Sequence, residues 1–346
     1  MGLFKDVIEP ATITLAFTAG TLINRRRLKP HQHHHHHHHR QRDIESIPEC
    51  ISGEKRTDVS SVERRKNKNK GSDLLVFRQL SWIFGTFPFL IEIWYWLLTY
   101  WIYQLSRAFT ARAIAGYPHI YALAKEHALQ LLAVERVLHI DFEQSFQAHM
   151  LANHACVMPA LQYIYHSHII VGVVFIIYTY TVLPPAVFRR IRRTIAVDNA
   201  IAFAIVSLWR CYPPRMLPPE YGFVDVLHDA AAGGQAGSVW TNNRFRLTIA
   251  AMPSLHFGTA LLFGVCLARF SPHAVVRVLA PLWPAAMFVT VVATANHFVL
   301  DLVVGAVVPL LGWRWNRGVL VLKPVHDWMW SPVTHRMDLE LDCYES

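Results

Sequence analysis

The sequence lacks the closely spaced cysteine pairs that hold a structural zinc ion. Only five cysteines occur in 346 residues, and no two of them form a C-x-x-C motif. We therefore expect no structural zinc site. Cys156 and Cys211 lie in segments predicted to face away from the cytosol, so a disulfide between them is an alternative that the sequence does not decide.

The N-terminal segment lacks both a signal-peptide cleavage site and a myristoylation signal. Residues 7–23 are apolar, and a run of arginines follows them after Asn24. Position 6 is Asp6, where a myristoylation signal carries serine or threonine. Residues 1–24 are therefore interpreted as either an N-terminal membrane anchor or an extra crossing.

The chain has little charge and much apolar surface. Hydrophobic residues make up 53% of it, and its mean hydropathy is positive. A soluble domain of this length usually has less apolar surface, so we expect a multi-pass membrane protein. The net charge of +9 would favour nucleic acid only if the basic residues shared an exposed face, but they cluster at the ends of apolar runs. We therefore expect no nucleic-acid partner.

Residues 25–73 are polar and highly charged, with too little apolar surface to offset the entropy of ordering. We predict a disordered linker that is basic and histidine-rich. The histidine run at 33–39 is either a natural low-complexity tract or an expression tag, and it could bind metal adventitiously. Neither origin bears on catalysis.

Six apolar stretches follow, each near the ~20 residues that a helix needs to span a bilayer. They lie near 74–104, 157–183, 194–210, 254–270, 276–296 and 298–315. We predict an all-α polytopic membrane protein with about six transmembrane helices. Residues 74–316 would form its helical bundle, and residues 317–346 a cytosolic tail.

The basic residues predict which way the bundle faces. If every stretch crosses, three groups share one side: Arg189, Arg190, Arg192 and Arg193; Arg269 and Arg277; Arg314, Arg317 and Lys323. By the positive-inside rule this side is cytosolic. Residues 211–253 and the turn at His297 then face the lumen or the exterior.

Residues 122–150, on the same non-cytosolic side, carry apolar residues at helical spacing. The pattern favours an ordinary packed helix within a loop over a helix that lies on the membrane or caps a site.

His297 and Asp301 are four residues apart, which on a helix places both side chains on one face within hydrogen-bond reach. The carboxylate can hold one imidazole nitrogen protonated and leave the other free to attack. The pair predicts His297 as a nucleophile that forms a phosphohistidine, oriented by Asp301.

A second motif, AAMPSLHFG at 250–258, precedes the first by one hairpin. Two crossings return the chain to the same face, so His256 and His297 are expected to meet. Pro253 suits the first turn of a helix, whose exposed amides and the Ser254 hydroxyl could bind a phosphate. A helix beginning at His297 would add its own amides, and His256 would protonate the leaving alkoxide.

Arg215 lies in a proline-rich segment on the same predicted side and offers a planar fork for phosphate oxygens. Arg210, Arg244 and Arg246 lie there too, against the positive-inside trend, and an anionic headgroup would explain them. The predicted phosphate contacts are Arg215, Ser254, Arg244 and Arg246. No metal or other cofactor is required, since side chains and helix ends supply nucleophile, acid and positive charge.

Each motif alone has a non-catalytic explanation. A membrane histidine often links helices by a hydrogen bond, and an H-x-x-x-D pair could belong to the proton path of a transporter. The order of the motifs, their shared side and the arginine-bearing loop together favour catalysis.

From about residue 80 to residue 315 the chain resembles the type 2 phosphatidic acid phosphatase superfamily, and more closely its inositolphosphotransferase branch, which includes fungal inositol phosphorylceramide synthase. The resemblance rests on YPPRMLPPEYGFVDVL (212–227), AAMPSLHFG (250–258) and TANHFVLD (294–301), with a weaker likeness at 127–147. It implies a phosphatidic acid phosphatase-like helical bundle. It also implies the roles already given for His297, Asp301, His256 and Ser254.

The sequence departs from the superfamily six residues before the nucleophile, where Val291 replaces an arginine, while Arg215 resembles the surviving first-motif arginine. Such a loss of cations fits a headgroup transferase better than a plain phosphatase. The resemblance implies membrane lipids as partners, with inositol phosphate moved from phosphatidylinositol to ceramide in sphingolipid metabolism. A lipid phosphate phosphatase is the alternative function, and a transporter is the third hypothesis. The resemblance further implies a Golgi or other endomembrane location with a luminal site.

Overall fold

The computed structural model describes residues 2–26, 79–227 and 248–328. The chain forms two compact units, one of Met1–Asn24 with Phe89–Pro324 and the other of Arg25–Pro88 with Val325–Ser346. Both histidine motifs lie in the first unit. Most of the predicted linker, its histidine run included, falls outside the described residues.

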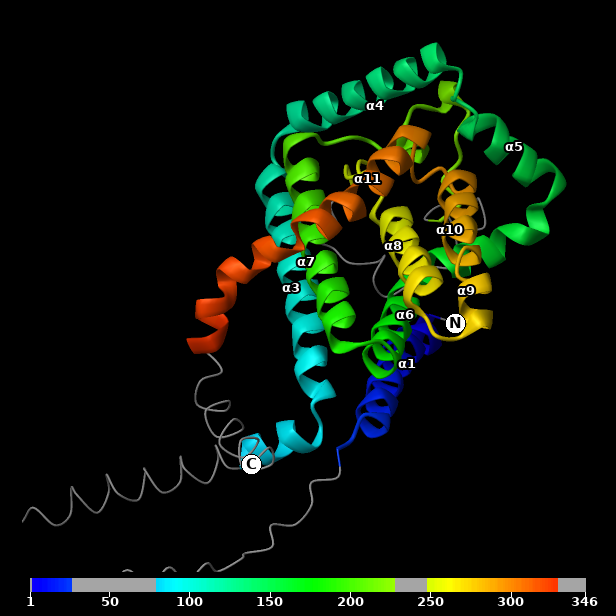
Figure 1. Ribbon diagram of the computed structural model, residues 1–346. Helices are drawn as coiled ribbons and strands as arrows, with labels where there is room; N and C mark the ends of the chain where they lie inside the picture. Colours follow the sequence, from blue (N-terminus) through cyan, green and yellow to red (C-terminus); the bar gives the residue numbers. More distant parts are fainter. Residues whose placement is uncertain (1, 27–78, 228–247, 329–346) are drawn as a thin grey trace, which may run out of the picture. The chain divides into compact units, whose positions relative to one another are not determined.

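The all-α prediction is confirmed, since the described ranges contain helices and no strands (Figure 1). The helices are α1 (Gly2–Ile23), α3 (Phe89–Ile114), α4 (Pro118–Leu138), α5 (Glu143–Asn153), α6 (Met158–Val182), α7 (Pro185–Leu208), α8 (Leu255–Phe270), α9 (Ala274–Leu279), α10 (Leu282–Ala293) and α11 (Val299–Trp315). Short 3-10 turns cover Ala155–Val157, Pro214–Met216, Pro219–Tyr221 and Asn316–Leu322. Each predicted apolar stretch overlaps one of the long helices.

Three segments of the described chain are long and apolar enough to cross a membrane: Ala155–Val182, Ala274–Ala293 and Val299–Trp328. A fourth is added if Gln79–Thr86 and α3 count as one span. The other predicted crossings correspond to α8, which has 16 residues, and to α7, which carries four arginines and an aspartate. These helices indicate an integral membrane protein.

The arrangement of the helices returns the two motifs to one end of the bundle. Helix α11 packs against α7 and α8, while α10 packs against α8 and α6. Helices α8 and α11 both begin near α4, and the turns joining α6 to α7 and α8 to α9 lie at the opposite end (Figure 1). The hairpin between the motifs therefore behaves as the sequence predicted.

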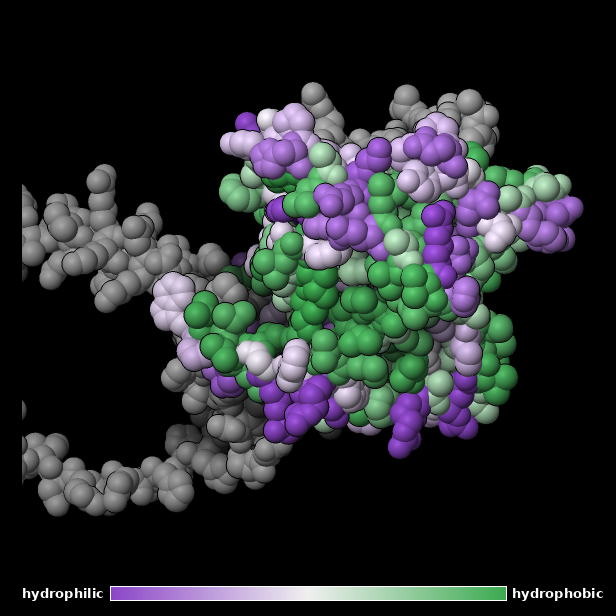
Figure 2. Space-filling model, turned by 90° about the horizontal axis from the view of Figure 1, so that it is seen from above, coloured by the Kyte–Doolittle hydropathy of each residue, from purple (hydrophilic) through white to green (hydrophobic). Residues whose placement is uncertain are grey.

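Helix α4 covers this end of the bundle. Its buried residues Ala124, Ala128, Leu132 and Glu135 lie on one face, and Ala128 and Leu132 pack in a cluster with Phe298. Helix α4 is a packed helix, as the sequence favoured, and its Glu135 also accepts a backbone N–H at the start of α11. Seen from above, hydrophobic residues occupy a broad central area of this end, and hydrophilic ones gather along its edges (Figure 2).

Candidate active site

The two histidine motifs are joined directly through their backbones. The Ser254 N–H donates to the carbonyl oxygen of Asp301 at 3.1 Å. A Cβ added at Gly258 would collide with the carbonyl oxygen of Gly305, and one added at Gly305 would lie 2.5 Å from the carbonyl oxygen of Ser254. Only glycine therefore lets α8 and α11 approach this closely, as small residues do at membrane helix contacts.

Gly258→Ala is expected to destabilise the protein by about 1–3 kcal/mol, because the added methyl group overpacks this contact. The unfolding midpoint in detergent should fall by roughly 2–10 °C. Gly172→Ala is the matched control, since its methyl group would only touch the Phe263 ring at 3.7 Å. An unchanged midpoint for Gly258→Ala would show that the helices can separate without cost.

His297 and Asp301 face each other at the start of α11. The Nδ1 atom of His297 lies 3.6 Å from Oδ2 of Asp301, which is longer than an N–H···O hydrogen bond. His297 is 6% exposed and Asp301 fully buried. The sequence placed both on one helix, but α11 begins at Val299, and Asp301 Oδ2 also accepts the N–H of Phe298 at 3.0 Å. Asp301 thus has two roles at once: it caps the helix, and it faces the imidazole of His297.

His256 lies within reach of His297, with ring centres 6.3 Å apart. Its ring stacks on Tyr165 at 4.3 Å and meets the edge of His168 at 4.3 Å, both from α6. His168 Nδ1–H donates to the carbonyl oxygen of Tyr165 at 3.1 Å, which leaves Nε2 as its acceptor. Sequence reasoning missed these two residues, although imidazoles inside an apolar span are a signal of function.

Ser254 lies at the start of α8 but is fully buried. The helix begins at Leu255, so Pro253 precedes its first turn instead of lying in it. The Ser254 hydroxyl accepts the N–H of Phe257 at 3.4 Å, as a helix N-cap does. Its contact with a phosphate stays a prediction.

The first amides of α11 are already bonded, which differs from the expectation that they would bind a phosphate. Carboxylates from three helices accept them. The pairs are Phe298 with Asp301 at 3.0 Å, Val299 with Glu143 at 2.7 Å and Leu300 with Glu135 at 2.7 Å. Sequence reasoning missed both glutamates. An anion at this helix start would have to displace a buried carboxylate.

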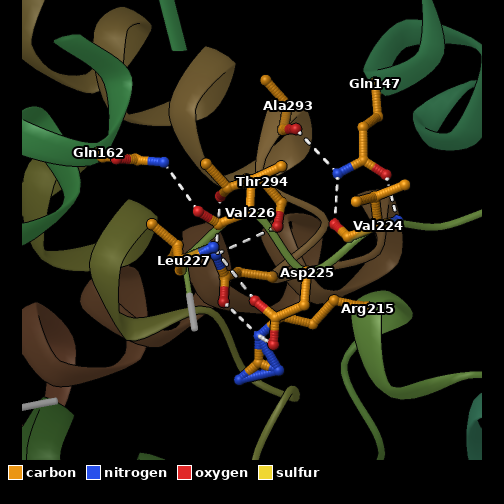
Figure 3. A network of polar contacts seen from close by, with 10 residues as sticks. Gln147, Gln162, Arg215, Val224, Asp225, Val226, Leu227, Ala293 and Thr294 are labelled. Atoms are coloured by element: carbon orange, nitrogen blue, oxygen red, sulfur yellow. Dashed lines mark hydrogen bonds and ion pairs between the residues drawn. The ribbon is translucent and has the colours of Figure 1, made fainter. Parts of the chain in front are cut away.

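Arg215 is held firmly beside the histidines. Its Nε donates to Oδ1 of Asn296 at 3.0 Å and lies 3.7 Å from Oδ2 of Asp225. Figure 3 shows how Gln147 and Gln162 anchor the backbone on either side of Asp225, so that the ion pair is fixed on both sides. This rigid placement suits a cation that must meet a phosphate in one geometry.

A cavity of about 340 Å³ adjoins the two histidines and Arg215, and it is walled by α3, α6 and α7. Arg107 of α3 lines it and interacts electrostatically with His256. Its guanidinium carbon lies 5.5 Å from the centre of the Tyr103 ring. Sequence reasoning missed Arg107, although an arginine inside an aromatic, apolar helix needs a reason.

The described residues give the site fewer cations than the sequence analysis considered. Val291, at the position of the superfamily arginine, is fully buried in an apolar cluster. Arg244 and Arg246 lie outside the described residues. The site as described therefore has Arg215 and Arg107 as its cations near the histidines.

Cys156 and Cys211, the cysteines that the sequence left as a possible disulfide, are free thiols, and burial raises the pKa of Cys211 above its usual range.

Comparison with known proteins identifies the family of the chain. The family model of the PAP2 superfamily matches residues 129–315, which is more than half of the chain and includes both histidines, Asp301 and Arg215. No curated protein and no solved structure matches the chain. Helix α3 and Arg107 lie outside the matched residues. The chain belongs to the PAP2 superfamily, whose members are phosphatases and phosphotransferases, and is an enzyme of that general type.

Proposed function

We propose that the protein transfers a phosphate-linked headgroup from one membrane lipid to another through a phosphohistidine on His297. The observation that carries the proposal is the meeting of His297 and His256 at one cavity with Arg215. A phosphate between the rings would meet a nucleophile on one side and a proton donor on the other.

In the first step, the free ring nitrogen of His297 attacks the phosphorus of a phosphodiester, and the bond to the lipid oxygen breaks. Protonated His256 gives its proton to the departing alkoxide, which leaves as a lipid alcohol. Asp301 stabilises the positive charge that grows on the His297 ring. In the second step, an acceptor hydroxyl attacks the same phosphorus, His256 takes its proton, and His297 is released.

The donor in this proposal is phosphatidylinositol, and the acceptor is ceramide. The likeness of segments 212–227 and 294–301 to the inositolphosphotransferase branch supports this choice. Val291 supports it too, because without the arginine fewer cations remain for a doubly charged phosphate monoester. The arginine-rich start of α7, at the opposite end of the bundle from the site, supports a luminal site in an endomembrane.

The test uses the purified full-length protein in liposomes with labelled phosphatidylinositol, with and without ceramide. Transfer predicts labelled inositol phosphorylceramide, together with an equal amount of diacylglycerol, only when ceramide is present. Ceramide-independent release of inorganic phosphate from phosphatidic acid, offered to the same liposomes, would identify the phosphatase alternative, with water as acceptor. Proton-coupled flux without any lipid product would instead favour a transporter.

Arg107→Gln is expected to lower kcat/KM by roughly 10- to 150-fold, because a hydrogen bond to a charged group is worth about 1.5–3 kcal/mol. Arg107→Lys should recover part of the loss, since the charge remains and the fork is lost. Arg112→Gln, an exposed position on the same helix, is the control. If Arg107→Gln and Arg112→Gln change kcat/KM equally in the liposome assay, Arg107 does not contact the substrate.

A further inference from the structure

Two glutamates from different helices meet at the start of α11. Glu135 of α4 and Glu143 of α5 are both fully buried. One oxygen of each accepts a backbone N–H of α11, and the two carboxyl groups interact directly with each other. The second oxygen of each has no donor within the described part of the chain. A single proton between these two oxygens would satisfy both of them.

The charge at this point also requires a proton. Asp301 brings a third carboxyl group to the same helix start, whereas the helix dipole offers only about half a positive charge. Among the described residues, Cys211 also faces the pair, since the charge of Glu135 acts on its thiol. His297 faces Asp301 on the far side of the same helix start. Burial raises the pKa of Glu135 to about 9, and the charges of Glu143 and Asp301 add to this rise.

We infer that Glu135 and Glu143 share one proton and act together as positioning residues, which fix the start of α11 and thereby hold His297 opposite His256. The activity readouts of this inference rest on the proposed function. Neither glutamate is among the residues that line the cavity, so the pair acts on catalysis through the placement of His297. The shared proton lets two acids bind two adjacent amides while carrying one negative charge between them.

A shared proton predicts an unusual pattern of substitutions. Glu135→Gln or Glu143→Gln should keep kcat within about 3-fold, because the amide N–H₂ replaces the shared proton and donates to the remaining carboxylate. The double glutamine variant sets donor against donor and should lower kcat about 100-fold, with KM nearly unchanged. Glu135→Ala should behave like the double variant. Glu126→Gln, exposed on α4, is the matched control.

The stability of the protein provides a readout that needs no substrate. Because the pKa of Glu135 is raised in the folded state, the folded protein binds a proton that the unfolded chain has released, and stability falls as pH rises from about 4.5 to about 9. The unfolding midpoint should show this slope in the wild type and in Glu126→Gln. It should be shallower in Glu135→Gln, which has no such proton to lose.

Infrared difference spectra between about pH 7 and about pH 10 complete the test, since they detect the carbonyl stretch of a protonated buried carboxyl group. The change in this band should be larger in the wild type than in either single glutamine variant. An equal change in all three proteins, or a single variant as impaired as the double, overturns the shared proton. A titrating band in a protein without lipid transfer would instead leave the pair intact and remove the proposed function.

Discussion

His297→Ala is expected to reduce headgroup transfer at least about 100,000-fold, because the variant lacks the atom that bonds to phosphorus. Donor binding should change little, since Arg215 keeps its partners Asn296 and Asp225. The loss should therefore fall on kcat, while KM for the donor lipid stays within a few-fold of the wild type.

Rapid quenching with donor labelled at phosphorus provides the measurement. The wild type should accumulate a labelled protein whose bond is stable in base and labile in acid, as a phosphohistidine is, and His297→Ala should show none. His273→Ala is the control, because this exposed histidine precedes α9 at the other end of the bundle. Labelled protein in the His297→Ala variant would place the nucleophile elsewhere.

The order of the motifs was enough to predict that His256 and His297 meet. Helix α8 leads away from this end, and α9 and α10 return the chain to it. The bond from Ser254 N–H to the Asp301 carbonyl joins the two motifs. The contact between His297 and Asp301 was also predicted, but from the wrong local structure. Helical periodicity assumed one continuous helix, whereas Phe298 is extended and α11 starts one residue later.

The partners of α11 could not be predicted in the same way. Glu135 and Leu300 are 165 residues apart, and Glu143 and Val299 are 156 apart. The apolar periodicity of residues 122–150 predicts a helix, but Leu123, Val134 and Leu138 of that apolar stripe are exposed in α4. The periodicity also does not say which distant backbone amide a buried carboxylate will meet. Arg107 was missed for a related reason, since only the packing of α3 against α7 brings it toward the motifs.

The capped start of α11 explains where positive charge for the phosphate must come from. A buried amide without a partner is costly, and substrate is present only part of the time. Permanent carboxylate partners keep the helix start satisfied when the cavity holds no lipid. Positive charge then has to reach the phosphate from side chains, which is what Arg215 and Arg107 offer at the cavity wall. The two arginines thus supply the positive charge for the phosphate, which the sequence analysis expected from the amides at the start of α11.

Asp301→Asn is the second large effect, with kcat expected to fall about 1,000- to 10,000-fold. Asparagine can still accept the N–H of Phe298, so the start of α11 should survive. The same oxygen position faces Nδ1 of His297, and a neutral amide oxygen attracts the Nδ1 proton less strongly than a carboxylate does, so the attacking tautomer is held less firmly. Loss of the negative charge further destabilises the imidazolium that forms during attack.

Single-turnover kinetics separate this effect from misfolding. Asp301→Asn should form the phosphohistidine slowly but to the same final level, with an unfolding midpoint near that of the wild type. Asp198→Asn is the matched control, because Asp198 is a buried acid of α7 that faces Gly312 instead of the cavity. If Asp301→Asn labels as fast as the wild type while His297→Ala does not label, the carboxylate caps the helix and does not orient the nucleophile.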